Sequence, residues 1–131
     1  MMIRKDGNPF TFLIVDDSRF ARSSLVKLVE QLDGEVVGEA ASGAEALEKH
    51  EELDPDVVTM DLSLPDVDGI ILVRKMMSVN PNTLIILSSG IPHEEVIEEA
   101  LRAGGEHFIS KPLDVEKASK IIEWVLRVSG K

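Results

Sequence analysis

The chain has 131 residues, enough for one domain with its own core, and its 24 acidic against 14 basic residues give a formal net charge of −10. This charge disfavours direct nucleic-acid contact, which needs Lys and Arg, and the lack of cysteine excludes disulfides and thiolate metal sites. No apolar run approaches the roughly 20 residues of a membrane span, and the amino-terminal MMIRKDGNPF has no apolar signal-peptide segment. We therefore expect a cytoplasmic protein, without membrane insertion, whose residues 1–131 form a single domain with a core of about 10–128.

The first half of the chain alternates apolar runs with helical patterns. Thr11–Val15 predicts a strand, and apolar residues at three- and four-residue steps from Leu25 to Leu32 predict the helix that follows it. Glu35–Ala40 predicts a second strand. Ser42 and Glu45 have the spacing of a capping box, which indicates that a second helix begins there.

The alternation continues in the second half. Val57–Met60 and Leu84–Leu87 are rich in Val, Ile and Leu, as are strands that are buried on both faces. Between them, Gly69–Val79 predicts a helix that stops before Pro81.

The last part of the chain adds two helices and one strand. Glu94–Ala103 predicts a helix that ends at the Gly104-Gly105 pair. His107–Ile109 predicts the fifth strand, and Asp114 is placed to cap the final helix.

Five strands alternating with five helices indicate an α/β fold, namely a doubly wound, five-stranded parallel sheet with helices on both faces. Right-handed crossovers leave few topologies, and the strand order 2-1-3-4-5 is one of the two common ones. Ligands of such sheets bind outside the carboxyl ends of the strands. The residues that follow each strand are therefore the candidates for a functional site.

Polar residues follow four of the predicted strands and would meet at one edge of the sheet: Asp16 and Asp17 after the first, Asp61 after the third, Ser88 and Ser89 after the fourth, and Lys111 after the fifth. Taken singly, Asp17 or Ser18 would serve as a helix N-cap, and the serines would suit an ordinary turn. Asp61 has no such explanation, because the next helix begins several residues later, near Gly69.

Three clustered carboxylates repel one another unless a cation lies between them. Their oxygen ligands, with no His or Cys nearby, favour a hard ion such as Mg²⁺, which takes one or two carboxylates and shares phosphate oxygens. Lys111 would neutralise one phosphoryl oxygen, a serine hydroxyl would donate to another, and Asp61 would act as the nucleophile that becomes an aspartyl phosphate. The edge is therefore predicted to be a phosphoryl-transfer site.

The segments LIVDDS, VVTMDLSLPDVDGI, LSSG and ALRAGGEHFISKP resemble the receiver domain of two-component response regulators, and the resemblance covers nearly the whole chain. It points to the stand-alone, CheY-like kind with a flavodoxin-like (βα)5 fold. It implies a phosphoprotein of a phosphorelay rather than a turnover enzyme. The phosphodonor would be the phosphohistidine of a sensor histidine kinase. A downstream effector protein would bind the face formed by the fourth helix, the fifth strand and the fifth helix.

The resemblance also implies a role for each site residue: Asp61 is the phosphoacceptor; Asp16, Asp17, Asp61 and the backbone carbonyl of Ser63 bind Mg²⁺; Lys111 contacts the phosphoryl group; Ser89 and Phe108 are the switch residues. It further implies a cis bond between Lys111 and Pro112. Phe108 lacks the hydroxyl of the tyrosine that often occupies its position.

The effector face has four candidate contact residues, which are Ile91, His93, Phe108 and Trp124. A tryptophan beside an apolar helix stripe is also typical of a core edge, so Trp124 has two interpretations. His93 and His107 have no ligand-like partners in the sequence, and neither is interpreted as catalytic.

Three alternatives stay open at the level of sequence. A dehalogenase-type phosphatase also uses Asp, Ser or Thr, Lys and Mg²⁺, but it would place two aspartates one residue apart after the first strand, whereas Asp16 and Asp17 are adjacent. A flavodoxin-like mononucleotide binder would need a phosphate loop rich in Gly, Ser and Thr after that strand. The chain would also suit a receiver fragment of a larger regulator.

Ile91 stands two residues after the switch serine, where many receivers carry a polar residue. Because an isoleucine cannot orient an attacking water by hydrogen bonding, we expect slow loss of the phosphoryl group. Ile91→Glu should shorten the acyl-phosphate lifetime, followed as the decay of phosphorylated protein. A rate increase of less than about twofold would count against this role of residue 91.

Overall fold

The computed structural model describes residues 3–90 and 93–131, and these form five strands and five helices in strict alternation. The strands are β1 (Thr11–Val15), β2 (Glu35–Ala40), β3 (Val57–Asp61), β4 (Leu84–Ser89) and β5 (Gly105–Ser110). The helices are α1 (Arg19–Gln31), α2 (Gly43–Leu53), α3 (Gly69–Val79), α4 (Glu94–Ala103) and α5 (Val115–Val128). The strands are parallel in the order β2-β1-β3-β4-β5, which confirms the predicted topology.

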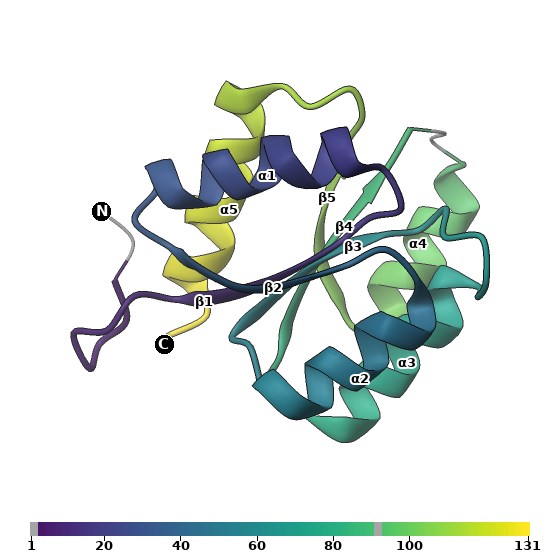
Figure 1. Ribbon diagram of the computed structural model, residues 1–131, viewed down its shortest axis with the longest axis horizontal. Helices are drawn as coiled ribbons and strands as arrows, with labels where there is room; N and C mark the ends of the chain where they lie inside the picture. The colour runs from purple at the N-terminus through teal and green to yellow at the C-terminus, as the bar shows by residue number, and fades with distance from the viewer. Residues whose placement is uncertain (1–2, 91–92) are drawn as a thin grey trace.

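The sheet separates two layers of helices, with α1 and α5 on one face and α2, α3 and α4 on the other (Figure 1). Side chains alternate between the faces along each strand. Ile14 and Ile86 pack in the core beneath α1 and α5, whereas Leu13 and Val58 pack in the core beneath the other three helices. β3 is buried over its whole length, as its central place requires. The parallel order brings all the carboxyl ends of the strands to one edge of the sheet.

β3 and β4 end later than their apolar runs suggested. The predicted strands stop at Met60 and Leu87, but backbone pairing continues through Asp61, which lies opposite Ser88, and on to Ser89. Hydrogen bonding between strands, and not apolarity, decides where a strand ends. Asp61, Ser88 and Ser89 are therefore the last residues of their strands, and all three are buried.

Gly105 belongs to β5 and not to the end of the preceding helix, which corrects the sequence interpretation. Gly104 alone forms the C-cap of α4, with φ 139° in the region that favours glycine. Gly105 pairs with Ile85, and a Cβ at Gly105 would lie only 2.8 Å from Leu87 Cδ1. This glycine is thus explained by close contact with the neighbouring strand.

Side chains cap four of the described helices, and the caps are Ser18, Ser42, Asp68 and Asp114. Ser18 caps α1, so Asp17 is not used for this purpose. α4 differs from the others. It begins at His93 without a side-chain cap, and Ala100 is its one fully buried residue. Among the described helices, α4 is therefore the least firmly anchored.

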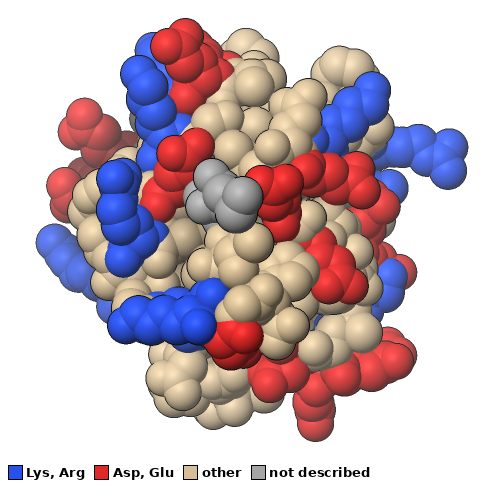
Figure 2. Space-filling view, turned by 90° about the vertical axis from the view of Figure 1, so that its left-hand side faces the viewer, with Lys and Arg blue, Asp and Glu red and all other residues tan. Residues whose placement is uncertain are grey.

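Figure 2 shows the face that carries the amino-terminus, opposite the carboxyl ends of the strands. Lys and Arg side chains are interspersed there with Asp and Glu and do not form a continuous basic patch. Within the described ranges, no helix has the length and apolarity that a bilayer crossing would require.

The loop between β3 and α3 is fastened to the start of α2. Asp66 accepts hydrogen bonds from the backbone N–H groups of Gly43 at 2.8 Å and Ala44 at 3.2 Å, and these bonds hold the pKa of Asp66 below its ordinary value. Val67 packs against Gly43, where a Cβ would lie 2.0 Å from Val67 Cγ1. The loop that follows Asp61 is therefore held in place from the side of α2.

Gly43→Ala should lower the free energy of unfolding by about 1–3 kcal/mol, because the added methyl group overlaps Val67. Urea denaturation would measure the change. The matched control is the double variant Gly43→Ala/Val67→Ala, in which the overlap is relieved, so the two substitutions should not be additive. Strict additivity would show that this contact does not determine the effect.

Candidate functional site

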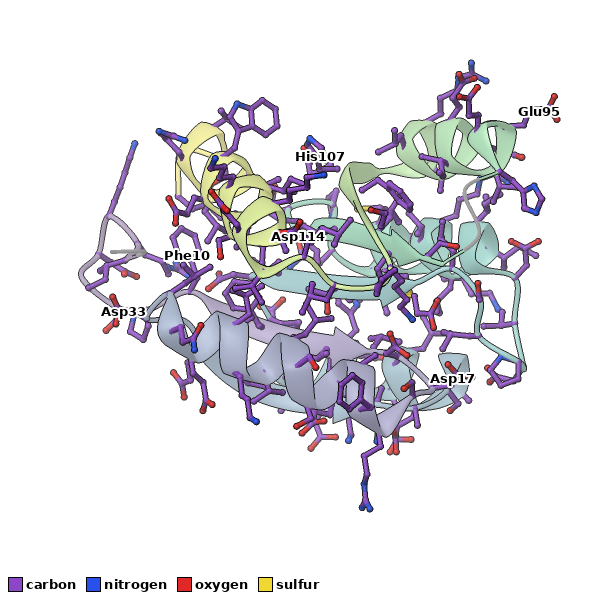
Figure 3. All side chains as sticks on the ribbon, turned by 90° about the horizontal axis from the view of Figure 1, so that it is seen from above. Phe10, Asp17, Asp33, Glu95, His107 and Asp114 are labelled. Atoms are coloured by element: carbon purple, nitrogen blue, oxygen red, sulfur yellow. The ribbon has the colours of Figure 1, made fainter. Side chains whose placement is uncertain are left out.

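The structure brings three carboxylates together at the carboxyl ends of β1 and β3. Asp16 and Asp61 are 0% and 1% exposed, whereas Asp17 is exposed, and one oxygen from each lies within 4.8 Å of the others. Figure 3 shows Asp17 at this edge, close to the start of α1, with Phe10 at the opposite end of the sheet. The convergence predicted from strand order is thus observed.

Lys111 joins this cluster from the end of β5. Its Nζ lies 2.6 Å from Asp16 Oδ2 and 3.2 Å from Asp61 Oδ2. The backbone places the lysine there, since the Lys111 N–H donates to the Ser89 carbonyl at 3.0 Å and the following bond to Pro112 is cis, as expected. One ammonium group therefore faces the two buried carboxylates.

Backbone donors fix the other oxygen of each buried carboxylate. The Ser18 N–H donates to Asp16 Oδ1 at 2.9 Å, and the Ser63 N–H donates to Asp61 Oδ1 at 2.8 Å. Asp61 thus has one oxygen held by the loop that follows it and a second oxygen that faces Lys111. This arrangement distinguishes the two oxygens chemically, because Oδ1 accepts from a backbone N–H group and Oδ2 from the Lys111 ammonium.

Burial and charge act in opposite directions on the titrating groups. Burial raises the pKa of Asp61, the negative charge of Asp16 raises it further, and the Ser63 N–H and the Lys111 ammonium only partly oppose this rise. Partial burial would lower the pKa of Lys111, but its hydrogen bond to Asp16 and the charges of Asp61 and Asp16 outweigh burial, so the pKa is raised. The lysine is cationic, and the cluster still has more negative than positive charge.

The donor set fits a hard divalent ion. Asp16, Asp17 and Asp61 all offer carboxylate oxygens, and the single charge of Lys111 does not balance three carboxylates. A divalent metal in this cluster would offset the repulsion from Asp16, which adds to the effect of burial in raising the pKa of Asp61. The acidic cluster is therefore a suitable metal site.

The two expected switch residues lie at the end of β4 and in β5. Ser89 is 4% exposed and lies opposite Ser110, and Phe108 is half-buried against the core beneath α2, α3 and α4. Ser88, its neighbour, is also buried and lies opposite both Asp61 and Ile109.

The effector-face residues are only partly described. Ile91 lies outside the described residues. His93 is exposed at the start of α4. Trp124 is 48% exposed and makes an edge contact with His107, with ring centroids 5.7 Å apart and an interplanar angle of 76°. Trp124 thus packs against His107 and presents the rest of its ring to solvent, and its role as an effector contact stays a prediction.

Sequence reasoning missed two residues that support the cluster. Arg22 Nη1 donates to the Asp16 carbonyl at 2.7 Å while its Nε contacts Glu39 at 3.2 Å. Asp66 holds the loop after Asp61 through two backbone N–H groups. Neither residue carries a spacing signal. Arg22 contacts a backbone carbonyl, whose identity is independent of side-chain type, and the partners of Asp66 are backbone groups distant in sequence.

Three comparisons identify the family. The model of the response regulator receiver domain matches residues 12–123. The chemotaxis protein CheY of Thermotoga maritima is 40% identical over 117 residues, 89% of this chain and 95% of that protein. A chain in the CheX–CheY–BeF₃–Mg²⁺ complex of Borrelia burgdorferi has a TM-score of 0.88 and 33% identity, with 94% of each chain covered.

The chain belongs to the response regulator receiver domain family. It is a CheY-like, phosphorylatable regulator of two-component signalling. The same kind of domain also occurs within longer proteins. A protein-glutamate methylesterase/protein-glutamine glutaminase of Alkalilimnicola ehrlichii is 43% identical over 127 residues, and the match spans 32% of that protein.

Asp61→Asn should stabilise the metal-free protein at neutral pH by about 1 kcal/mol. A carboxyl group whose folded-state pKa is raised stabilises the fold below its unfolded pKa, and this stability is lost as pH rises through the folded pKa. The ionised Asp61 is therefore unfavourable near pH 7. Urea denaturation in EDTA would measure the difference, which should vanish below the ordinary carboxyl pKa of about 3.9.

Asp66→Asn serves as the control of opposite sign, because the folded state lowers the pKa of Asp66. Mg²⁺ should raise the stability of the wild type and have much less effect on Asp61→Asn. An Asp61→Asn variant that is less stable than wild type in EDTA would contradict this account of the cluster.

Proposed function

We propose that Asp61 accepts a phosphoryl group from the phosphohistidine of a sensor histidine kinase, and that the chain acts as a switch and not as a turnover enzyme. The position of Lys111 is the main support for this proposal. Its ammonium lies 3.2 Å from Asp61 Oδ2 and 2.6 Å from Asp16 Oδ2, at the carboxyl edge of the sheet. This geometry suits a group that gains negative charge on Asp61 during reaction.

The transfer uses the oxygen of Asp61 that faces the lysine. Oδ1 is held by the Ser63 N–H, so Oδ2 attacks the phosphorus of the donor. The O–P bond forms as the N–P bond of the phosphohistidine breaks, and its electron pair returns to the imidazole ring. Lys111 then lies beside the phosphoryl oxygens and neutralises part of their charge.

Asp16, Asp17 and Asp61, with the backbone carbonyl of Ser63, would hold Mg²⁺. The ion would supply charge neutralisation for the phosphoryl oxygens. Asp16 and Asp17 contribute by their placement at the end of β1, and the all-oxygen donor set supports this assignment.

Ser89 and Phe108 would convert the modification into a change of shape. The Ser89 hydroxyl donates to a phosphoryl oxygen, and Phe108 moves toward the space that this leaves, which alters the face formed by α4, β5 and α5. Moving a two-state mixture from 1:99 to 99:1 needs about 5.5 kcal/mol, the size of a few charge-assisted hydrogen bonds. A downstream effector protein would bind the altered face.

We further infer that residues 1–131 act as one receiver domain, with a core of about 10–128, in the cytoplasm where a kinase would meet it. The two cores on either side of the sheet support this single unit, since the strands share both. Nucleic acid is not a direct partner in this proposal, because the formal charge of −10 is unfavourable for phosphate contacts.

Incubation of the chain with acetyl phosphate and Mg²⁺ should add one phosphoryl group to Asp61, measured by intact mass and by peptide mapping. Asp61→Asn should gain none, and EDTA should abolish the gain in the wild type. The switch role of Ser89 is tested with the variant Ser89→Ala. Ser88→Ala is its matched control, because both variants remove a buried hydroxyl of β4 but only Ser89 is assigned to the switch. A gain of mass at another residue, or steady hydrolysis of phosphate esters, would overturn the proposal.

A further inference from the structure

A cavity of about 300 Å³ lies next to the phosphoryl-transfer residues, on the face of the sheet that α1 covers. Ala21 and Leu25 of α1 form one wall, and Ile86 and Ile109 of the sheet form another. Pro112, in the loop between β5 and α5, closes a third side. The mechanism proposed for Asp61 uses none of these five side chains, so the cavity needs a separate explanation.

Two buried hydroxyl groups belong to the lining of this largely apolar cavity. Thr59 of β3 and Ser88 of β4 are 2% and 5% exposed. Side chains alternate along a strand, so Thr59 shares its face with Val57 and Ser88 shares its face with Ile86, and both of these apolar residues pack beneath α1 and α5. Both hydroxyl-bearing side chains therefore project toward the cavity side of the sheet.

Neither hydroxyl oxygen has a hydrogen-bond partner within residues 3–90 and 93–131. A buried hydroxyl without a partner is unfavourable, and folded proteins rarely leave one so. Rotation about a single side-chain bond would turn either hydroxyl of Thr59 or Ser88 toward an occupant. A polar atom held in the cavity would therefore gain a hydrogen bond that the protein does not supply to itself.

The volume and the charges restrict the occupant. A cavity of about 150 Å³ is enough for benzene, so 300 Å³ accommodates one ring with a small substituent. Lys111 also lines the cavity, but its ammonium already faces Asp16 and Asp61. The described lining includes no carboxylate, and the Lys111 ammonium is already paired. An anion or a cation would therefore lose its hydration among apolar walls without gaining a free partner. A neutral molecule fits best.

We propose that the cavity between α1 and the β5–α5 loop binds a small neutral molecule that carries one apolar ring and one hydroxyl group, with the ring against α1 and the hydroxyl directed at Thr59 and Ser88. Such a ligand matches the pocket class in which apolar walls supply most of the contact and a few polar groups set orientation. Asp61 is not among the residues that line this cavity, although Lys111 borders both sites, and the proposed binding needs no phosphorylation.

Titration of the unphosphorylated, isotopically labelled chain with phenol, followed by amide NMR, tests the proposal. Phenol should give saturable shifts at the amides of Ala21, Leu25 and Ser88, with a Kd of about 1 mM or tighter. Benzoate, the anionic analogue, should bind at least about fivefold more weakly, because its carboxylate would lose hydration among apolar walls while the Lys111 ammonium is already paired. Equal binding of phenol and benzoate would overturn the charge argument.

Variants decide whether the shifts report this cavity. Ser24→Leu places a larger side chain into the cavity from α1 and should weaken phenol binding by at least about tenfold. Ser23→Leu makes the same change at the neighbouring exposed position and should leave binding unchanged. Thr59→Val combined with Ser88→Ala should weaken phenol about fivefold while leaving toluene unaffected, since only phenol offers a hydroxyl.

Absence of saturable shifts in the wild type, or equal effects of Ser24→Leu and Ser23→Leu, would overturn the proposal. So would a phenol affinity that is insensitive to loss of both hydroxyls, because the cavity would then be a plain apolar void. These measurements involve no phosphodonor, so their failure leaves the assignment of Asp61 untouched.

Discussion

The site depends on one electrostatic constraint. Two carboxylates are buried side by side, and a single ammonium group lies between them and partly neutralises their charge. Asp16 and Asp61 come from different strands, and Lys111 comes from a third. These three residues are far apart in sequence and meet only because their strands belong to one sheet. The fold itself therefore holds the like charges together. Burial and the charge of Asp16 together raise the pKa of Asp61, and a divalent ion in the cluster would offset the part that is due to like charge.

The surrounding elements keep this arrangement rigid on one side. Backbone N–H groups of Ser18 and Ser63 fix one oxygen of each buried carboxylate, and Arg22 holds the Asp16 carbonyl. Asp66 fastens the loop after β3 to the start of α2. Such pre-positioned donors hold the two buried carboxylates in a fixed orientation, which suits the role proposed for Asp61.

The sequence permits prediction of the sheet order and of the convergence of Asp16, Asp61 and Lys111, because apolar periodicity locates parallel strands and parallel strands end at one edge. It misplaces Gly105, since close approach to Leu87 is a property of the packed sheet and not of the local glycine pair. The support from Asp66 is invisible in sequence for a similar reason, as its partners are backbone groups of another helix. The cavity beneath α1 is likewise a product of how helix and sheet fit together, which no residue pattern encodes.

α4 is the least firmly anchored of the described helices, and this sets it apart from its neighbours. Its neighbours on the same face, α2 and α3, begin at side-chain caps and are tied to the loop that follows β3, whereas α4 begins without such a cap and buries little of its own surface. Elements with few buried contacts open locally at the lowest free energy, so α4 is the described helix that should open first. Because α4 follows β4 in the chain, the least anchored of the described helices comes directly after the strand that ends with the buried Ser88 and Ser89.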